Sequence, residues 1–208
     1  NCIFDDEAVS DASRREIVRR YYQAMCDLRT GRGEESAVAK IELLMNKAEI
    51  TVDINPTVAA SLRKAEETGM PAVAIELPDG QVITGKTSSL LGASSAALLN
   101  ALKVLAGLDD SLHLIAPEVI EPIQHLKISH LGNHNPRLHT DETLIALSIS
   151  AVTDPNAERA MEHLAELSGC DAHSTVILSQ VDTDVFRKLG VNMSCEPRYQ
   201  TKKLYHKR

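Results

Sequence analysis

The chain has 208 residues, a formal net charge of -7, 43% hydrophobic and 25% charged residues. This composition is ordinary for a soluble globular protein, and the length allows one large domain or a domain with a helical extension. The acidic balance argues against a nucleic-acid-binding surface, and the 3% aromatic content argues against a stacking platform for bases. No apolar run approaches the roughly 20 residues of a membrane span, and no signal peptide is recognisable.

The four cysteines, Cys2, Cys26, Cys170 and Cys195, form no CxxC pair. This spacing disfavours a zinc ribbon or a thioredoxin-type site, and no metal or cofactor is expected. Free thiols are typical of a reducing cytoplasm, which is the predicted location. Because the chain opens at Asn1 rather than at an initiator Met, we expect it to be part of a longer polypeptide.

Residues 1–70 are predicted to form a helical annex. Ser10 or Asp11 is placed to cap a first helix with an apolar stripe, and a second helix follows. Pro56 suits the first turn of a third helix, which Gly69 ends. The annex contains no chemical motif.

Residues 71–208 are predicted to form an α/β domain. The segments AVAIEL and QVITG within residues 72–85 have strand composition, and the Asp79-Gly80 pair between them predicts a hairpin turn. The helix at 93–106 is apolar nearly all round, which predicts burial against a sheet.

Strands and helices alternate over the remainder of the chain, which is the α/β pattern. The predicted strands are HLIAP, HSTVILS and VNMSC at 113–117, 173–179 and 191–195, and the predicted helices lie at 118–128, 140–152, 155–169 and 181–190.

Small hydroxyl residues gather at the start of the helix at 93–106. Neither GxxxxGK[ST] nor GxGxxG occurs, so neither nucleotide fingerprint is present. Ser94 and Ser95 stand at the head of the helix, and Ser88 and Ser89 precede them on a polar loop. Since helix N–H groups and the helix dipole hold anions, we predict these four serines as ligand contacts; capping and a turn are the alternative interpretation.

Other polar residues extend the predicted site. His173, followed by Ser174 and Thr175, is expected where a loop enters a strand, a place where α/β proteins bind ligands. We predict His173 and Glu121 as acid/base residues, and Ser174, Thr175 and Asn135 as ligand contacts. The composite site requires His173 to lie near the head of the helix at 93–106.

Four of the eight histidines fall between His125 and His139, mostly in a segment with loop composition. No HExxH spacing appears, so a polar surface loop is the preferred interpretation. Zinc hydrolysis through these histidines is the third functional alternative.

The order hairpin, loop, helix, strand, helix over residues 72–128 resembles the cytidine deaminase fold. That family carries [HC]-x-E at the head of its buried helix and P-C-x-x-C after the next strand. Here these places read ASSA at 93–96 and PEVIE at 117–121, without the zinc ligands or the catalytic Glu. The resemblance implies a three-layer α/β sandwich at 71–208, carrying the annex, and the motif departures argue against zinc deamination.

Longer blocks are similar to the C-terminal region of a bacterial family, number 1846 among the catalogued domains of unknown function. They include PDGQVITGKTSSLLGASSAALLNALK, LIALSISAVTDPNAERAME and FRKLGVNMSCEP. This resemblance implies a cytosolic protein in which a longer N-terminal α/β part, with a glycine-rich phosphate-binding loop, precedes Asn1. That N-terminal part is the first expected partner.

Two main functions follow from these expectations. The first is a half-site for an anionic, in particular phosphorylated, small molecule, completed by the N-terminal part. The second is a non-catalytic assembly domain that dimerises the parent protein through its apolar helices and gives a homo-oligomer. Neither nucleic acid nor membrane is expected as a partner.

Overall fold

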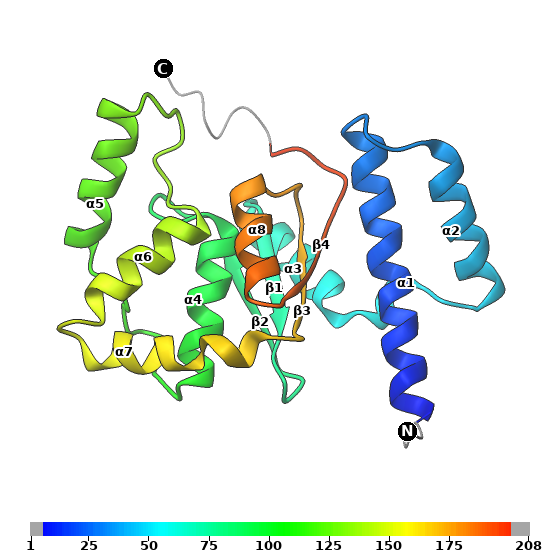
Figure 1. Ribbon diagram of the computed structural model, residues 1–208, viewed down its shortest axis with the longest axis horizontal. Coiled ribbons are helices and arrows are strands. Elements are labelled where there is room, and N and C mark those ends of the chain that lie inside the picture. The colour runs from blue at the N-terminus through cyan, green and yellow to red at the C-terminus, as the bar shows by residue number, and fades with distance from the viewer. Residues whose placement is uncertain (1–5, 201–208) are drawn as a thin grey trace.

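The computed structural model describes residues 6–200, and the predicted hairpin forms one side of its sheet (Figure 1). β1 (Ala72–Glu76) pairs antiparallel with β2 (Val82–Lys86). On its other edge β1 pairs antiparallel with β3 (Asp171–Ser174), which pairs parallel with β4 (Asn192–Cys195). The order is therefore β2-β1-β3-β4, a mixed four-stranded sheet of an α/β protein.

Helices of several lengths surround this sheet. Those within residues 6–200 are α1 (Asp6–Arg29), α2 (Glu35–Lys47), the short η1 (Val52–Ile54), α3 (Pro56–Thr68), α4 (Ala93–Leu105), α5 (Pro117–His125), the wider π-type turn η2 (Leu126–His130), α6 (Thr140–Ser150), α7 (Pro155–Glu162), the short η3 (His163–Leu167) and α8 (Gln180–Lys188). None of them combines the length and the apolar character needed to cross a bilayer.

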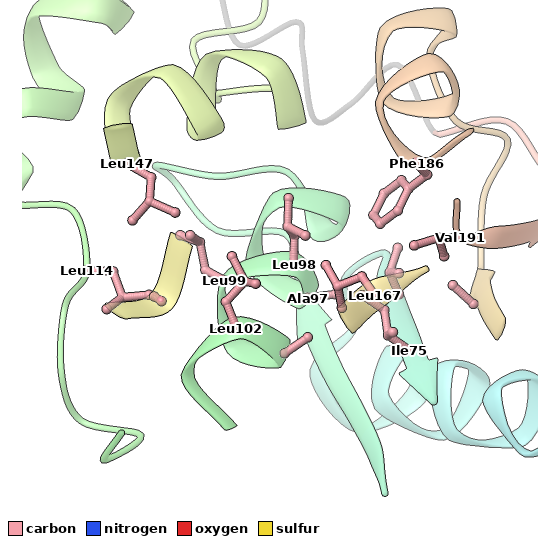
Figure 2. Close-up of a cluster of buried hydrophobic side chains, with 14 of the residues drawn as sticks. Ile75, Ala97, Leu98, Leu99, Leu102, Leu114, Leu147, Leu167, Phe186 and Val191 are labelled. Carbon is pink, nitrogen blue, oxygen red and sulfur yellow. The ribbon is translucent and has the colours of Figure 1, made fainter. Parts of the chain in front are cut away.

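α4 packs directly on one face of the sheet, as its nearly uninterrupted apolar sequence predicts. Contact with β2 is so close that a Cβ at Gly85 would lie 2.1 Å from the backbone nitrogen of Ala97. Because alternate strand residues point to the same face, Val73 and Ile75 of β1 project toward α4 together with Gly85. Figure 2 shows Ile75 and Leu98 within this cluster, where both are buried.

α1 and α3 cover the opposite face. Ala74 and His173, which pair across β1 and β3, point to this side, and the His173 imidazole contacts the ring of Tyr22 on α1. A second apolar cluster joins α1, α2 and α3 around Val18 and Val58, so the helices before residue 70 have a small core of their own. In Figure 1, α2 lies on the outer side of α1.

The start and end predicted for α3 are confirmed. Pro56 is its first residue, the Asn55 side chain accepts a hydrogen bond from the Thr57 N–H, and Gly69 ends the helix at a φ of 64°. Glycine adopts this left-handed conformation at little cost, which is why it suits the end of a helix.

Three predictions about helices and strands are wrong. α1 begins at Asp6, so Ser10 and Asp11 lie inside the helix. The segment 113–117 contains no strand among the described residues; its apolar character comes from burial of Leu114 and Ile115 beside α4. The strand predicted at 173–179 is β3 instead, which ends at Ser174.

Candidate functional site

The N-termini of three helices meet at one small cavity. α4 contributes Gly92 to Ser94, α6 is preceded by His139, and α8 is preceded by Ser179. The cavity has a volume of ~100 Å³ and is closed on its other sides by the loop after β2 and the segment after β3. Each helix N-terminus carries a partial positive charge, so all three favour an anionic group at this place.

The α6 and α8 termini already have an internal anion. Asp182 Oδ1 accepts hydrogen bonds from Thr140 N–H and Thr140 Oγ1, both at 3.0 Å, and Asp182 Oδ2 accepts one from Ser179 Oγ at 2.7 Å. Ser179 Oγ accepts from the Asp182 N–H in return, which is a reciprocal cap of α8. α4 differs, because its N-cap residue is Gly92, which has no side chain to cap the first turn.

A buried hydroxyl lies at the same cavity without a partner. Thr87, just after β2, lines the cavity and is 2% exposed, and its Oγ1 has no hydrogen-bond partner among the described residues. Burying a hydroxyl without a hydrogen bond costs about 1–3 kcal/mol, so such groups are rare and each one calls for an explanation. A ligand group in the cavity would supply the missing partner.

His139 and Asp182 form a hydrogen-bonded pair on the cavity wall. His139 Nδ1 donates to Asp182 Oδ2 at 3.1 Å. This hydrogen bond raises the pKa of His139 above its ordinary value, although burial acts in the opposite direction. Burial would raise the pKa of Asp182, but the hydrogen bonds from His139, the Thr140 N–H and Ser179 lower it overall. The pair therefore favours an imidazolium beside a carboxylate.

Arg137 adds a fixed positive charge to the wall. Its Nε donates to the backbone oxygen of Ser88, which ties the loop before α6 to the loop before α4. Arg137 and His139, the pKa of which is raised, both lie on this wall beside the carboxylate of Asp182. The charged side chains of the cavity thus favour an anion as well.

Two of the predicted ligand contacts lie at this cavity. Ser94 and Asn135 both line it, Ser94 from the first turn of α4 and Asn135 from the loop before α6. The Asn135 side-chain oxygen accepts a hydrogen bond from the Arg137 N–H at 3.1 Å, which orders the loop.

The other residues predicted around α4 lie outside the cavity. Ser95 is fully buried and its hydroxyl donates to the Leu138 backbone oxygen at 3.1 Å. Ser88 Oγ accepts from the Leu91 N–H at 3.0 Å and so serves a turn, while Ser89 and Glu121 are exposed on the surface. For Ser88, the hydroxyl therefore stabilises a turn, which was the alternative to a ligand contact.

The predicted convergence of His173 with the head of α4 does not occur. His173 lies in the middle of β3 rather than at a loop, and points to the face covered by α1, whereas α4 lies on the other face. Ser174 Oγ donates to the Val176 backbone oxygen, and Thr175 Oγ1 accepts from the Ala72 N–H, so both hydroxyls are used in the local backbone structure. The strand was displaced in the prediction, which put these residues at the wrong end of the sheet.

The residues that define the cavity were not among the predicted ligand contacts. They are Thr87, Arg137, His139, Ser179 and Asp182. One signal was present: Ser179 and Asp182 fit the S-x-x-D pattern of a helix start. His139 and Asp182 are 43 positions apart in the sequence, so no local pattern indicates their hydrogen bond.

The loop histidines were considered as zinc ligands. His125 and His130 have ring centroids 5.5 Å apart. Within residues 6–200, no three His, Cys, Asp or Glu side chains are grouped so as to hold a metal ion.

Comparison with known sequences places the chain in a family. Residues 53–205 match the family model described as "Domain of unknown function DUF1846, C-terminal", and residues 1–49 match the one described as "Domain of unknown function DUF1846, N-terminal". The chain belongs to the DUF1846 family. The resemblance inferred from the sequence blocks is thereby confirmed. The two matches meet between α2 and η1.

Bacterial relatives agree with this assignment. The chain is 53% identical over 205 residues to a UPF0371 protein of Streptococcus pyogenes serotype M5 and 54% identical over 205 residues to one of Streptococcus thermophilus. Each alignment covers 99% of this chain and 42% of the relative. The chain thus spans less than half the length of these curated relatives.

Proposed function

We propose that the cavity at the head of α4 binds the anionic group of a small molecule, in particular a phosphate, and that the rest of the longer family protein completes the site. The observation that carries the proposal is Thr87 Oγ1, a buried donor without a described partner, beside a helix N-terminus without a side-chain cap. A phosphate oxygen accepts hydrogen bonds from both kinds of group.

Size and charge support the same ligand. A cavity of ~100 Å³ holds roughly three waters at their liquid volume, which is too small for a whole drug-sized ligand and suits a compact anion. Arg137 and His139 supply positive charge, and Ser94 supplies a further hydroxyl. A carboxylate of the protein, Asp182, is already neutralised by its own partners.

The test is a titration with inorganic phosphate, followed by calorimetry, on the wild type and two valine variants. Thr87→Val keeps the side-chain shape and removes the hydroxyl, so phosphate affinity falls roughly tenfold. Thr143→Val is the matched control, because Thr143 Oγ1 is also buried without a described partner but does not line the cavity.

Two results would contradict the proposal. One is a wild-type protein that does not bind phosphate at millimolar concentration. The other is a Thr87→Val protein whose phosphate affinity equals that of Thr143→Val.

A second candidate function is self-assembly, and α6 supplies the observation that favours it. Ile145, Ile149 and Val152 follow one another at helical spacing on and just after α6, and are 58%, 55% and 82% exposed. Contiguous exposed apolar residues mark interaction surfaces, so we infer that this stripe contacts a second copy. Mass measurement in solution tests this: Ile149→Asp converts a dimer to a monomer, and a monomeric wild type would refute the inference.

A further inference from the structure

We propose that the cavity and a larger hollow beside it form one two-part site for a phosphate monoester whose body carries hydroxyl or amino hydrogen-bond donors. The inference rests on the proposed function, because the phosphate occupies the cavity. It adds the chemical class of the remainder of the ligand.

The two spaces share part of their walls. The outer hollow has a volume of ~560 Å³ and lies against the start of α6, η2 and the loop between them. Asn135 and His139 line both the cavity and the hollow. The outer volume falls in the range of small-molecule sites, whereas the cavity alone does not. A molecule anchored by its phosphate in the cavity therefore has room for its body on the far side of these two residues.

The charged residues of the outer hollow determine which chemical groups suit the part of the ligand beyond its phosphate. Lys127, 3% exposed, donates from Nζ to Glu142 Oε2 and to the Arg137 backbone oxygen, both at 2.6 Å, so its charge and that of Glu142 are matched. Asp141 also lines the hollow, and it has no ion-pair partner among the described residues. The Asp141 carboxylate only accepts hydrogen bonds, so a ligand body with hydroxyl or amino groups gives it donors and a body with a carboxylate gives it none.

His139 connects the two parts. Its Nδ1 lies 3.1 Å from Asp182 Oδ2, and its ring lines both the cavity and the outer hollow. Lys127, Glu142 and Asp182 are the charged groups around it, and the Asp182 contact dominates. The imidazolium can therefore donate from Nε2 to an oxygen of the bound monoester.

The experiment compares four probes by calorimetry on the native full-length protein. Inorganic phosphate reports the cavity alone. Glucose 6-phosphate adds hydroxyl donors, phosphoethanolamine adds an amine, and phosphoglycolate adds a carboxylate and no donor. We expect at least one of the two donor-bearing esters to bind about tenfold more tightly than phosphate, and phosphoglycolate to bind no more tightly than phosphate. The ester that gains affinity identifies the kind of body.

Variants separate the two parts of the site. Asp141→Asn removes the tenfold gain and leaves the affinity for inorganic phosphate unchanged, which also shows that the variant is folded. Asp184→Asn is the matched control, since Asp184 lies on α8 and lines neither space, and it keeps the gain.

The outcomes distinguish this inference from the proposed function. If phosphate binds but neither donor-bearing ester binds more tightly, the two-part site is wrong and the anion cavity stands. The same holds if Asp141→Asn retains the full gain or phosphoglycolate shares it. If phosphate itself does not bind, the proposed function fails and this inference fails with it.

Discussion

The ring of Tyr22 lies 4.6 Å, centroid to centroid, from the imidazole of His173. Tyr22 belongs to the part of the chain that matches the N-terminal family model, and His173 to the part that matches the C-terminal one. Glu196 joins the contact, because its carboxylate lies 3.4 Å from His173 Nε2 and its interaction with Tyr22 contributes to a lowered pKa of Glu196. Since Tyr22 and His173 are buried, this group fastens α1 to the sheet from within.

Removing only the Tyr22 hydroxyl tests how much this contact stabilises the protein. Tyr22→Phe keeps the ring against His173 and removes the hydroxyl that interacts with Glu196. We expect the free energy of unfolding, measured by urea denaturation, to fall by about 1–2 kcal/mol. Tyr199→Phe is the control: Tyr199 is 54% exposed, and its loss of a hydroxyl changes stability by less than about 0.5 kcal/mol. Equal effects of the two variants would contradict a stabilising role for the buried hydroxyl.

Glu196 makes stability depend on pH on the acid side. The contact with His173, with a smaller contribution from Tyr22, lowers the pKa of Glu196 below its ordinary value of 4.5, although burial acts in the opposite direction. A lowered pKa means that the folded state binds this proton less readily than the unfolded state does. The contribution is therefore complete above pH 4.5 and is lost as the pH falls through the folded pKa.

Urea denaturation at a series of pH values measures this contribution. The free energy of unfolding of the wild type is expected to fall more steeply below pH 4.5 than that of Glu196→Gln, which has no carboxylate to titrate there. Parallel profiles would show that the Glu196 carboxylate has the same pKa in the folded and unfolded states.

Gly85 is required because α4 lies so close to β2. A methyl group on Gly85 would stand 2.1 Å from Ala97 N, and a helix backbone cannot move aside as a flexible side chain can. We expect Gly85→Ala to lower the free energy of unfolding by more than about 3 kcal/mol or to prevent folding. Gly69→Ala is the comparison, because Gly69 has open space around it and only its φ of 64° is unfavourable for alanine. Its cost is about 1–2 kcal/mol, so a Gly85→Ala protein as stable as Gly69→Ala would be inconsistent with the close packing.

The local elements were predictable where one segment carries its own signal. The Asp79-Gly80 turn and the apolar pattern of α4 specify the hairpin and the buried helix without reference to other segments. A strand was wrongly predicted at Leu114 and Ile115, because buried loops and buried strands both contain apolar residues. The deaminase-like arrangement stays a prediction, and the strand it needs at 113–117 is absent from the described residues.

The site was only partly predictable, for a different reason. The uncapped head of α4 can be recognised from Gly92 and the serines that follow it. Arg137 and Asp182 form other parts of the cavity wall, and their positions depend on how α6 and α8 pack. His173 was assigned to the site because the start of the strand was misjudged by two residues. It was therefore expected at a loop, whereas it lies within β3 on the face covered by α1.

Thr87 provides a prediction in which stability and binding change in opposite directions. Its buried hydroxyl has no described partner in the ligand-free protein, so Thr87→Val raises the free energy of unfolding by about 1 kcal/mol while weakening phosphate binding. Thr143→Val, which removes a second unpartnered hydroxyl outside the cavity, also raises the free energy of unfolding.

Urea denaturation with and without phosphate separates the two variants, because a ligand stabilises only a native state that binds it. Thr143→Val keeps the stabilisation by phosphate and Thr87→Val loses most of it. A Thr87→Val protein less stable than the wild type without phosphate would mean that the Thr87 hydroxyl has a hydrogen-bond partner within the protein. The main observation that supports an anion in the cavity would then be removed.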